Sequence, residues 1–302
     1  GERWRIKNSY LGDHVDRIVS LLLWGYRMTG CHWCGGGVEV GDGPSMRPEW
    51  RRWRCAKCGA LGYLNNPSVD ELRQVYVEAW ENSASSGKFA TGATDGKIAR
   101  SLLGALKFSP LGVNCLDYGG GKGEFAKALM EYGCKHLTVF EPFGQNPKIQ
   151  NVRWVNDLKA VSGIKFDWIF MIEVLEHLLN PREELEKIKQ LLAPNGKMVI
   201  TTPNALGWRA RIGGFKWREA QNPTHINLFT PELLKTVLYK LGFSAVKRVM
   251  CPVQYKATGL SAFALAVTQI LGVDGGIRII GYVNNHDFTG GSVNQKCSER
   301  IA

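Results

Sequence analysis

The sequence predicts an α/β protein whose mostly parallel sheet is wound by helices on both faces. From about residue 97 onward, strand-like and helix-like segments alternate along the chain. Four glycines occur among the five residues from Gly119 to Gly123, directly after the first of these strands. Polar residues follow the later strands where each one ends. Because ligands in such sheets bind beyond the carboxyl ends of the strands, these segments should surround a binding site.

A small cysteine module precedes the alternating region. Its two C-x2-C pairs are separated by twenty residues and consist of Cys31, Cys34, Cys55 and Cys58. This spacing is typical of a structural zinc site, and the glycine after each pair suits the left-handed turn of a zinc knuckle. Two disulfides, four thiols without a metal, and an iron site are the alternatives, and disulfides fit less well because we recognise no secretion signal. With a helix expected over residues 9–28, residues 1–66 form an N-terminal helix and zinc-binding module.

Residues 67–96 are expected to act as a helical linker or lid. Ser68 followed by Glu71 predicts the start of a helix. The stretch from residue 81 to 96 is small, polar and rich in glycine, which predicts a mobile loop and a hinge.

Residues 97–285 contain the alternating pattern. Helical spacing occurs in residues 97–106, 124–133, 182–193 and 231–242. Strand-like runs occupy residues 113–118, 136–141, 152–155, 166–172, 197–202 and 244–251. Residues 257–273 are uncharged, and we interpret them as a buried helix, with contact to a membrane surface as the alternative to burial. The tail, residues 286–302, looks irregular.

The glycine-rich segment reads LDYGGGKGE, and Asp117 ends the strand before it. Gly119, Gly121 and Gly123 allow a tight turn and the approach of a ligand to bare backbone. The spacing differs from the G-x-G-x-x-G of dinucleotide-binding folds, and the lysine pattern of a phosphate-binding loop is missing. A dinucleotide or a nucleoside triphosphate is therefore not the expected ligand.

Acidic residues follow the next three strands. Glu141 ends the second strand, where a carboxylate can accept both hydroxyls of a ribose. Asp157 follows the third strand and suits the amino group of an adenine, while Glu173 follows the fourth. Each of them alone has a simpler reading as a helix cap or a surface charge, but their order along the chain favours one common site.

These motifs resemble those of the class I S-adenosylmethionine-dependent methyltransferases, over roughly residues 97–250. LDYGGGKGEF is similar to the family's first motif, VFEP to its ribose-binding motif, and FDWIFMIEVLEHL and NGKMVITTPN to its fourth- and fifth-strand motifs. EVLEH with the later THINLFTPELL is similar to the branch that methylates small molecules such as quinones, sugars and natural products. The resemblance implies a seven-stranded, Rossmann-like sheet and S-adenosylmethionine as the cofactor.

The resemblance also implies which residues bind the cofactor: Asp117, Gly119, Gly121, Glu141, Asp157, Leu158 and Glu173. The first three would hold the amino-acid end, Glu141 the ribose, the next two the adenine, and the last would line the floor near the methionine moiety. Bare amides and carboxylates suit a ligand that has an ammonium, a diol and an amino-purine.

Methyl transfer from a sulfonium needs mainly alignment, and it needs a base only where the acceptor must lose a proton. His177 and His225 are the candidate bases, since histidine titrates near neutrality, and the alternative for each is a structural histidine. Sugar carbon-methylating relatives have a Tyr and a Glu just before the histidine at the position of His225, where this chain has Asn222-Pro223-Thr224. That difference favours oxygen or nitrogen over carbon as the acceptor atom.

The net charge of +11 permits an anionic partner. The segment GWRARIGGFKWRE, before His225, contains the candidate substrate residues Trp208, Arg209, Arg211 and Trp217. They suit a nucleotide-sugar, a phosphorylated glycan or a carboxylated metabolite, and the glycines between them suggest a flexible lid. A second basic, tryptophan-bearing patch, RPEWRRWR at residues 47–54, has two readings, contact with nucleic acid or simple solvation.

We therefore expect a cytoplasmic methyltransferase that acts on a small-molecule or glycan acceptor and has no membrane span. One alternative is an RNA methyltransferase that docks through the zinc module and the basic patches, since arginine and aromatic side chains also suit RNA. The other is a non-enzymatic binding or scaffold protein that retains the cofactor fold. The sequence does not indicate an oligomeric state.

Overall fold

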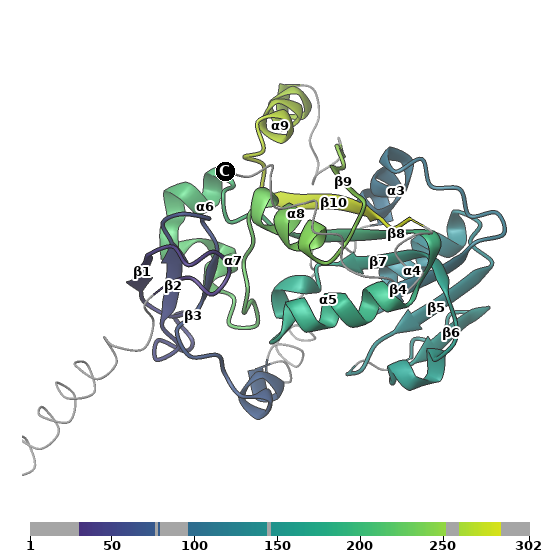
Figure 1. The fold of residues 1–302 in the computed structure, drawn as a ribbon, viewed down its shortest axis with the longest axis horizontal. Coiled ribbons are helices and arrows are strands. Elements are labelled where there is room, and N and C mark those ends of the chain that lie inside the picture. Colours follow the sequence, from purple (N-terminus) through teal and green to yellow (C-terminus); the bar gives the residue numbers. More distant parts are fainter. Residues whose placement is uncertain (1–29, 76–77, 79–95, 144–145, 252–259, 285–302) are drawn as a thin grey trace, which may run out of the picture.

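The computed structural model describes residues 30–75, 78, 96–143, 146–251 and 260–284. The helix expected over residues 9–28, most of the expected hinge and the C-terminal tail lie outside these residues. The described chain forms a seven-stranded sheet with flanking helices and a second, three-stranded sheet (Figure 1). The helix start predicted at Ser68 is confirmed, because the backbone N–H of Ser68 donates to Glu71 Oε2 at 2.7 Å and that of Glu71 donates to Ser68 Oγ at 3.3 Å.

The large sheet has the strand order β6-β5-β4-β7-β8-β10-β9. Its strands are β4 (Asn114–Tyr118), β5 (His136–Phe140), β6 (Val152–Val155), β7 (Phe166–Ile172), β8 (Leu192–Pro203), β9 (Ala245–Arg248) and β10 (Gly276–Tyr282). The chain runs outward from β4 to β6 and then crosses to β7 and β8. The switch point, where ligands bind in such sheets, therefore lies between β4 and β7.

The predicted fold class is confirmed, but one strand was not located from the sequence. β10 pairs antiparallel with both β8 and β9, and it separates them. Its sequence, GIRIIGY, is interrupted by Arg278, whose guanidinium pairs with Asp274 at 2.9 Å. A charged residue within so short an apolar run removes the usual signal of a buried strand.

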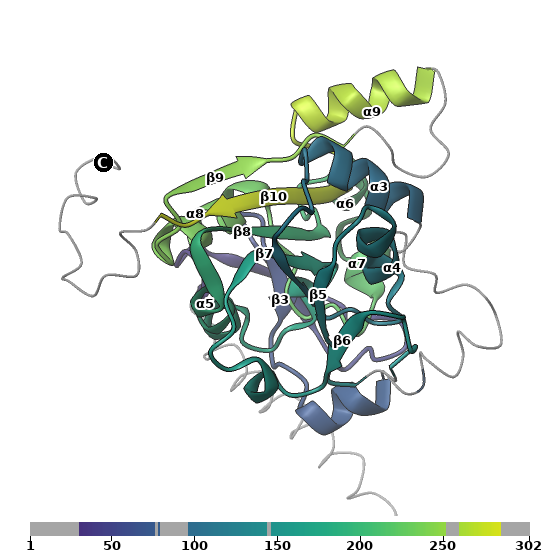
Figure 2. The same cartoon turned by 90° about the vertical axis from the view of Figure 1, so that its right-hand side faces the viewer.

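Helices cover both faces of the sheet. α3 (Gly96–Ala105) and α4 (Glu124–Glu131) lie on one face, and α5 (Pro181–Gln190) and α8 (Pro231–Lys240) lie on the other (Figures 1 and 2). Along β7, Trp168 and Phe170 pack with α3 and α4, whereas Ile169 and Met171 pack with α5 and α8. Burial on both sides explains why this strand is a continuous apolar run instead of an alternating one.

The cysteine module is an antiparallel ribbon of β1 (Val38–Gly41), β2 (Arg52–Cys55) and β3 (Leu61–Tyr63). It lies beside the segment that follows β8, which contains α6 (Trp208–Gly213) and α7 (Arg218–Gln221) (Figure 1). Leu61 of β3 and Leu228 exchange two backbone hydrogen bonds of 3.0 and 2.9 Å. The ribbon is thus joined to the large sheet's domain through the chain just before α8.

Helix α9 (Leu260–Ile270) corrects one expectation. A helix was predicted here as buried, but Phe263 is 73 % exposed and Ile270 is 69 % exposed. Figure 2 shows α9 standing away from the sheet. Among the described residues, no helix is both long enough and apolar enough to cross a bilayer.

Candidate active site

The glycine-rich segment after β4 forms a tight loop above the switch point. The N–H of Gly119 donates to the carbonyl of Phe140 at 2.8 Å, and that of Gly121 donates to Glu141 Oε2 at 2.8 Å. Gly119, Gly121 and Gly123 all have positive φ, of 79°, 51° and 79°. The loop is therefore held against the end of β5 in a backbone conformation that favours glycine.

Only part of this glycine content leaves room for a ligand. A Cβ at Gly119 would lie 2.6 Å from a methyl of Val174, and one at Gly120 would lie 2.3 Å from a methyl of Val139. A Cβ at Gly121 would meet nothing within 4 Å. Packing thus requires the first two glycines, and Gly121 is the one whose backbone faces open space.

Asp117 is the second-to-last residue of β4, lies beneath this loop and is buried. Its Oδ2 has no hydrogen-bond partner among the described atoms. Burial, together with the nearby Glu141, raises the pKa of Asp117 to about 7. A buried carboxylate without a partner is costly, and an ammonium group would supply both the charge and the hydrogen bond that it lacks. This residue therefore fits the amino-acid end of the expected cofactor.

Glu141 and Asp157 lie after the next two strands, as predicted. Glu141 accepts hydrogen bonds from the backbone N–H groups of Gly121 and Phe143, at 2.8 and 2.9 Å, so it also braces the glycine loop. Asp157 is exposed and caps the short helix η1 (Leu158–Val161), where it accepts the N–H of Lys159 at 2.9 Å. The cap reading of Asp157 is thus observed, and its contact with an adenine remains a prediction.

Residues 173–177 join the glycine loop to the other side of the site. Glu173 adopts a φ of 55°, and its Oε1 accepts the hydroxyl of Thr201 at 2.8 Å. Val174 packs against Gly119. The carbonyl of Glu176 accepts the backbone N–H groups of residues 226 and 227 at 2.7 and 3.0 Å. Residues 173–177 therefore contact both the glycine loop and the chain around residue 225.

A group of ionisable side chains lies at the end of this segment, which includes the short helix η2 (Leu175–His177), and all but the half-buried His177 are buried. The rings of His177 and His225 meet edge to face with centroids 4.8 Å apart. One ring nitrogen of each histidine and a carboxylate oxygen of Glu176 all lie within 4.8 Å of one another. Nδ1 of His177 is 2.9 Å from the carbonyl oxygen of Thr224, so it donates and Nε2 has the lone pair. Nδ1 of His225 lies 3.4 Å from Glu219 Oε2 without the geometry of a hydrogen bond.

Burial sets the protonation states of this group. It lowers the pKa of His177 to about 4. It also lowers the pKa of His225 well below its usual value, and the charges of Arg52 and Arg218 lower it further. Burial raises the pKa of Glu176 well above its usual range. At neutral pH both imidazoles are therefore uncharged, and each can accept a proton.

The four predicted substrate residues do not share one environment. Trp208 and Arg209 are exposed and stack on each other, with the guanidinium carbon 4.9 Å from the ring centroid. Arg211 is exposed and donates through Nε to a backbone carbonyl at 3.0 Å. Trp217 is buried in a small apolar cluster with Leu61 of the ribbon. Trp217 therefore packs the ribbon against this segment, whereas the other three reach solvent.

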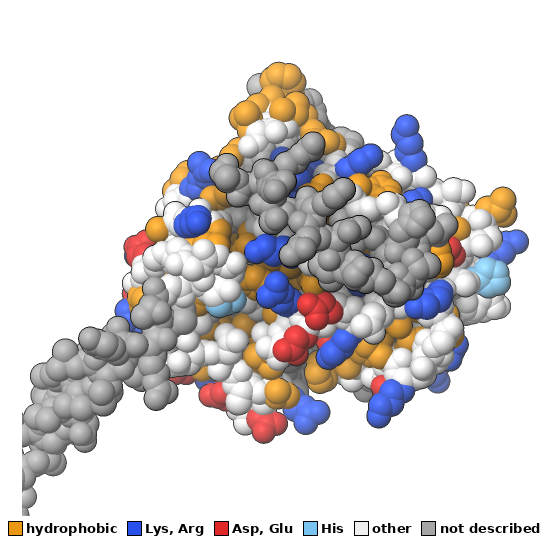
Figure 3. Space-filling model, in the orientation of Figure 1, with side chains coloured by type: hydrophobic (Ala, Val, Ile, Leu, Met, Phe, Trp, Pro, Cys, Tyr) orange, Lys and Arg blue, Asp and Glu red, His pale blue; other side chains and the backbone are white. Residues whose placement is uncertain are grey.

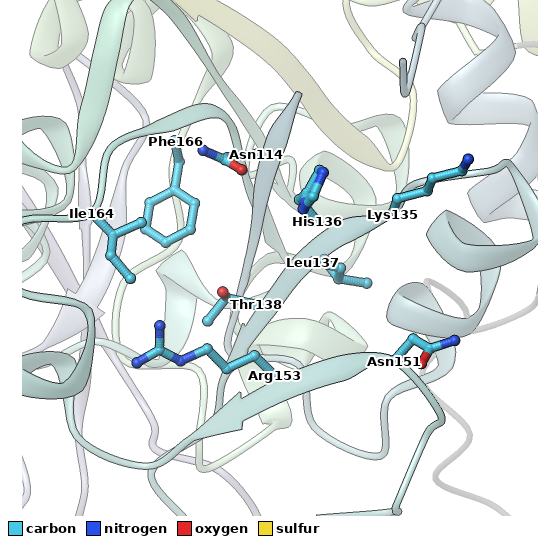
Figure 4. A pocket seen from close by; sticks show the side chains of 9 residues that line it. All are labelled: Asn114, Lys135, His136, Leu137, Thr138, Asn151, Arg153, Ile164 and Phe166. Atoms are coloured by element: carbon cyan, nitrogen blue, oxygen red, sulfur yellow. The ribbon is translucent and has the colours of Figure 1, made fainter. Parts of the chain in front are cut away.

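A shallow hollow with polar walls lies at the opposite edge of the sheet. It is lined by Asn114, Lys135, His136, Leu137, Thr138, Asn151, Arg153, Ile164 and Phe166. These residues lie at or near the starts of β4 to β7, whereas the glycine loop and the histidines follow strand ends. Figure 4 shows Lys135 and Arg153 directed away from each other, so the hollow does not gather its cations toward one ligand.

The four cysteines of the ribbon meet as predicted. The sulfurs of Cys31 and Cys58 are 3.7 Å apart, those of Cys34 and Cys55 are 3.4 Å apart, and all four lie within 4.8 Å of one another. A tetrahedral zinc ion with Zn–S bonds of about 2.3 Å would space its sulfurs by about 3.8 Å. The N–H groups of Lys57 and Cys58 each donate to Cys55 Sγ at 3.3 Å. The donor set therefore fits a closed structural zinc site.

We expect about one zinc ion per chain, because the four sulfurs together complete the tetrahedral coordination of a single ion. Cys55→Ser should remove the zinc and destabilise the ribbon, which metal analysis and thermal unfolding of the purified protein would detect. Cys134→Ala is the matched control, since this buried thiol lies outside the cluster. Iron in place of zinc, or full zinc content in Cys55→Ser, would contradict the assignment.

Sequence reasoning missed three residues of the site: Arg52, Glu176 and Glu219. Glu176 lies within EVLEH, but roles were assigned only to Glu173 and His177. Arg52 was read as part of an exposed basic patch, whereas it is fully buried. No local signal could reveal this, because two of its hydrogen-bond acceptors lie 170 and 173 residues away along the chain.

Comparison with known proteins gives two kinds of match. Residues 90–248 match the family described as "Methyltransferase domain". The chain is 32 % identical over 191 residues to a ubiquinone biosynthesis O-methyltransferase of Cereibacter sphaeroides, covering 57 % of this chain and 76 % of that protein. It is 26 % identical over 149 residues to the mitochondrial enzyme of the same name from Arabidopsis thaliana, covering 43 % and 46 %.

Among solved structures, the chain resembles the 1,6-didemethyltoxoflavin-N1-methyltransferase of Burkholderia thailandensis, which was determined with bound 1,6-didemethyltoxoflavin and S-adenosylhomocysteine. The TM-score is 0.49 at 16 % identity, and the match covers 73 % of this chain and 92 % of that one. The assignment of a family therefore depends on the two sequence matches and not on this likeness.

Proposed function

Because this chain belongs to the class I S-adenosylmethionine-dependent methyltransferase family, in its small-molecule branch, we propose that it methylates a hydroxyl oxygen of a small anionic acceptor and that His225 accepts the proton. The relatives named above are O-methyltransferases of ubiquinone biosynthesis, which supports a hydroxyl as the acceptor group. They support a small molecule over RNA, and a quinone-like aromatic over a glycan.

Residues at the strand ends would hold the cofactor. In this proposal Asp117 meets the ammonium group, and the backbone of Gly119 and Gly121 lies along the amino-acid end. Glu141 accepts hydrogen bonds from the ribose while it braces the glycine loop. Asp157, Leu158 and Glu173 complete the site at the adenine and methionine ends. When bound, S-adenosylmethionine supplies a methyl group that its sulfonium has already activated.

The observation that carries the proposal is the pair of uncharged imidazoles, His225 buried and His177 half-buried, that residues 173–177 connect to the glycine loop. An imidazole with a lowered pKa is available as a base at neutral pH, but its cation needs stabilisation once it has accepted the proton. Glu219 Oε2, 3.4 Å from His225 Nδ1, is placed to supply it. His225 would then accept the acceptor's proton at Nε2 and share the resulting charge with Glu219.

The exposed guanidinium groups of Arg209 and Arg211 support an anionic acceptor. A carboxylate or a phosphate would form charge-assisted hydrogen bonds with them. On the face that Figure 3 displays, the described Lys and Arg side chains are spread between acidic and uncharged ones. This distribution suits a small anion better than a long polyanion.

The direct test is methyl transfer to aromatic probes. The protein is incubated with S-adenosylmethionine labelled in its methyl group and with 3,4-dihydroxybenzoate, catechol, 3,4-diaminobenzoate or 3,4-dimethoxybenzoate, and the products are identified by mass spectrometry. We expect labelled methoxy product from the first two, with a higher KM for catechol, which has no carboxylate. Methylation of the diamine in preference to the diol would contradict oxygen transfer.

Two further measurements address the alternatives. A steep fall of RNA affinity with rising salt would favour an RNA methyltransferase, since each phosphate contact releases counterions. Failure to bind S-adenosylhomocysteine at micromolar concentrations would favour a scaffold protein. Tight cofactor binding without an RNA complex is the result that we expect.

A further inference from the structure

We propose that Arg52 is a positioning residue through which the cysteine ribbon holds the loop that contains His225. The inference rests on the acceptor-side role of His225 proposed above and extends it to the ribbon. The ribbon would then be part of the acceptor side of the active site, and its metal would act on methyl transfer through the shape of this loop.

The ribbon contacts the acceptor side of the fold along its length. Beyond the pairing of Leu61 with Leu228, the hydroxyl of Thr230 donates to the carbonyl of the metal-site residue Cys58 at 3.0 Å. Arg54 donates to two backbone carbonyls between β8 and the end of α6, at 3.2 and 3.3 Å. The ring centroids of Trp33 and Phe229 are 5.2 Å apart. All of these partners lie between residues 205 and 230, the stretch that contains His225.

Arg52 makes the contact closest to the histidine. Its Nη2 donates to the carbonyl oxygens of Asn222 and His225, each at 3.0 Å, and to the hydroxyl of Tyr63 at 2.8 Å. That hydroxyl in turn donates to the carbonyl of Pro223 at 3.0 Å. Arg52 and Tyr63 thus hold three of the four carbonyls from residue 222 to residue 225.

The guanidinium is fully buried, and its carbon lies 4.0 Å from the centroid of the Tyr63 ring. Among the described residues no carboxylate forms an ion pair with it. A buried cation without an anion is costly, so the carbonyl oxygens and the ring must offset that cost. Arg52 therefore keeps this stabilisation only while residues 222–225 stay in place.

The charge of Arg52 also acts on His225. The other ionisable groups that face this imidazole are His177 and Glu176 after β7, and Arg218 and Glu219 at α7. The two arginines oppose protonation of His225, and Glu219 favours it. Replacement of Arg52 by a neutral residue should therefore raise the pKa of His225 as well as loosen its backbone.

The test compares Arg52→Met, Arg52→Lys and Tyr63→Phe with Arg51→Met, a control in which the neighbouring, partly exposed arginine changes. Amide hydrogen exchange is measured separately for residues 222–228 and for the glycine loop, and zinc content and affinity for S-adenosylhomocysteine are measured on each variant. Histidine labelled at Cε1 with ¹³C reports the pKa of His225 by NMR. Turnover is followed with 3,4-dihydroxybenzoate.

For Arg52→Met we expect at least tenfold faster exchange in residues 222–228, a raised pKa of His225 and at least tenfold lower kcat. Zinc content, exchange of the glycine loop and cofactor affinity should stay at wild-type values. Arg52→Lys should recover part of kcat, since lysine keeps the charge and three donors. Tyr63→Phe should show a smaller change in the same direction.

Wild-type exchange of residues 222–228 in Arg52→Met and Tyr63→Phe would overturn the inference. An equal loss of cofactor affinity and turnover in Arg52→Met would also overturn the inference, because Arg52 would then stabilise the whole fold and not this loop in particular. If His225→Ala left turnover unchanged while Arg52→Met still loosened the loop, the proposed base would be wrong and the link between ribbon and loop would stand.

Discussion

His225→Ala is expected to lower kcat by about 100- to 10,000-fold, the range typical of a lost general base, while affinity for S-adenosylhomocysteine stays unchanged. The physical reason is that an acceptor hydroxyl must lose its proton as the new bond forms. In a buried site, water is a poor replacement for an imidazole as the base that accepts this proton. The measurement is steady-state turnover with 3,4-dihydroxybenzoate, together with cofactor binding by calorimetry.

His136→Ala is the matched control for this prediction, because His136 is an exposed histidine at the start of β5, on the opposite edge of the sheet. It should retain wild-type kcat. Turnover of His225→Ala within a factor of a few of wild type would make His225 a structural histidine, the alternative left open by the sequence.

The pH dependence provides a further check on the base. Because its pKa is lowered well below the usual 6.5, His225 stays uncharged as the pH falls through that value. At saturating cofactor we therefore expect kcat to stay level from pH 7.5 to 6.5 and to fall only at lower pH. A fall of kcat centred on pH 6.5 would show that the base has an ordinary histidine pKa.

Asp117→Asn is expected to weaken binding of S-adenosylhomocysteine by roughly 10- to 150-fold, from the loss of about 1.5–3 kcal/mol for a hydrogen bond between charged groups. The ligand-free variant should not be less stable than wild type, because the change removes a buried carboxylate whose Oδ2 has no partner. Calorimetric titration and thermal unfolding without ligand measure the two effects.

The pKa of about 7 for Asp117 sets the pH dependence of this binding. The folded pKa lies above the value near 3.9 of an unfolded chain, so ionisation destabilises the ligand-free fold as the pH rises from about 4 to about 7. A bound ammonium favours the ionised form. Affinity should therefore increase as the pH rises through about 7 and then level off, and Asp117→Asn should lose this dependence.

Asp157→Ala is the graded comparison, since its exposed carboxylate already caps η1. We expect a smaller loss of cofactor affinity than for Asp117→Asn. An equal or larger loss would mean that the adenine end, and not the ammonium, accounts for most of the binding energy.

The sequence was sufficient to predict the order of the helices and strands from β4 to β8 and the edge of the sheet at which the polar loops meet. β4 to β8 and their helices follow from apolar periodicity, which is local, and the loops after parallel strands share one edge whatever the details of packing. This is why Asp117, Glu141 and Glu173 could be assigned to one edge of the sheet in advance. The cysteine spacing predicted the cluster for the same reason, since each knuckle is a local turn.

Tertiary structure decided what distant segments do to one another. Gly119 must be glycine because Val174 packs against it, and Trp217 fills a space between the ribbon and the domain. Arg52, in a basic patch that reads as exposed, is buried beneath the backbone of His225. Burial and long-range hydrogen bonds set these roles and the protonation states of both histidines. Both depend on residues that are distant along the chain, so the local sequence pattern does not predict them.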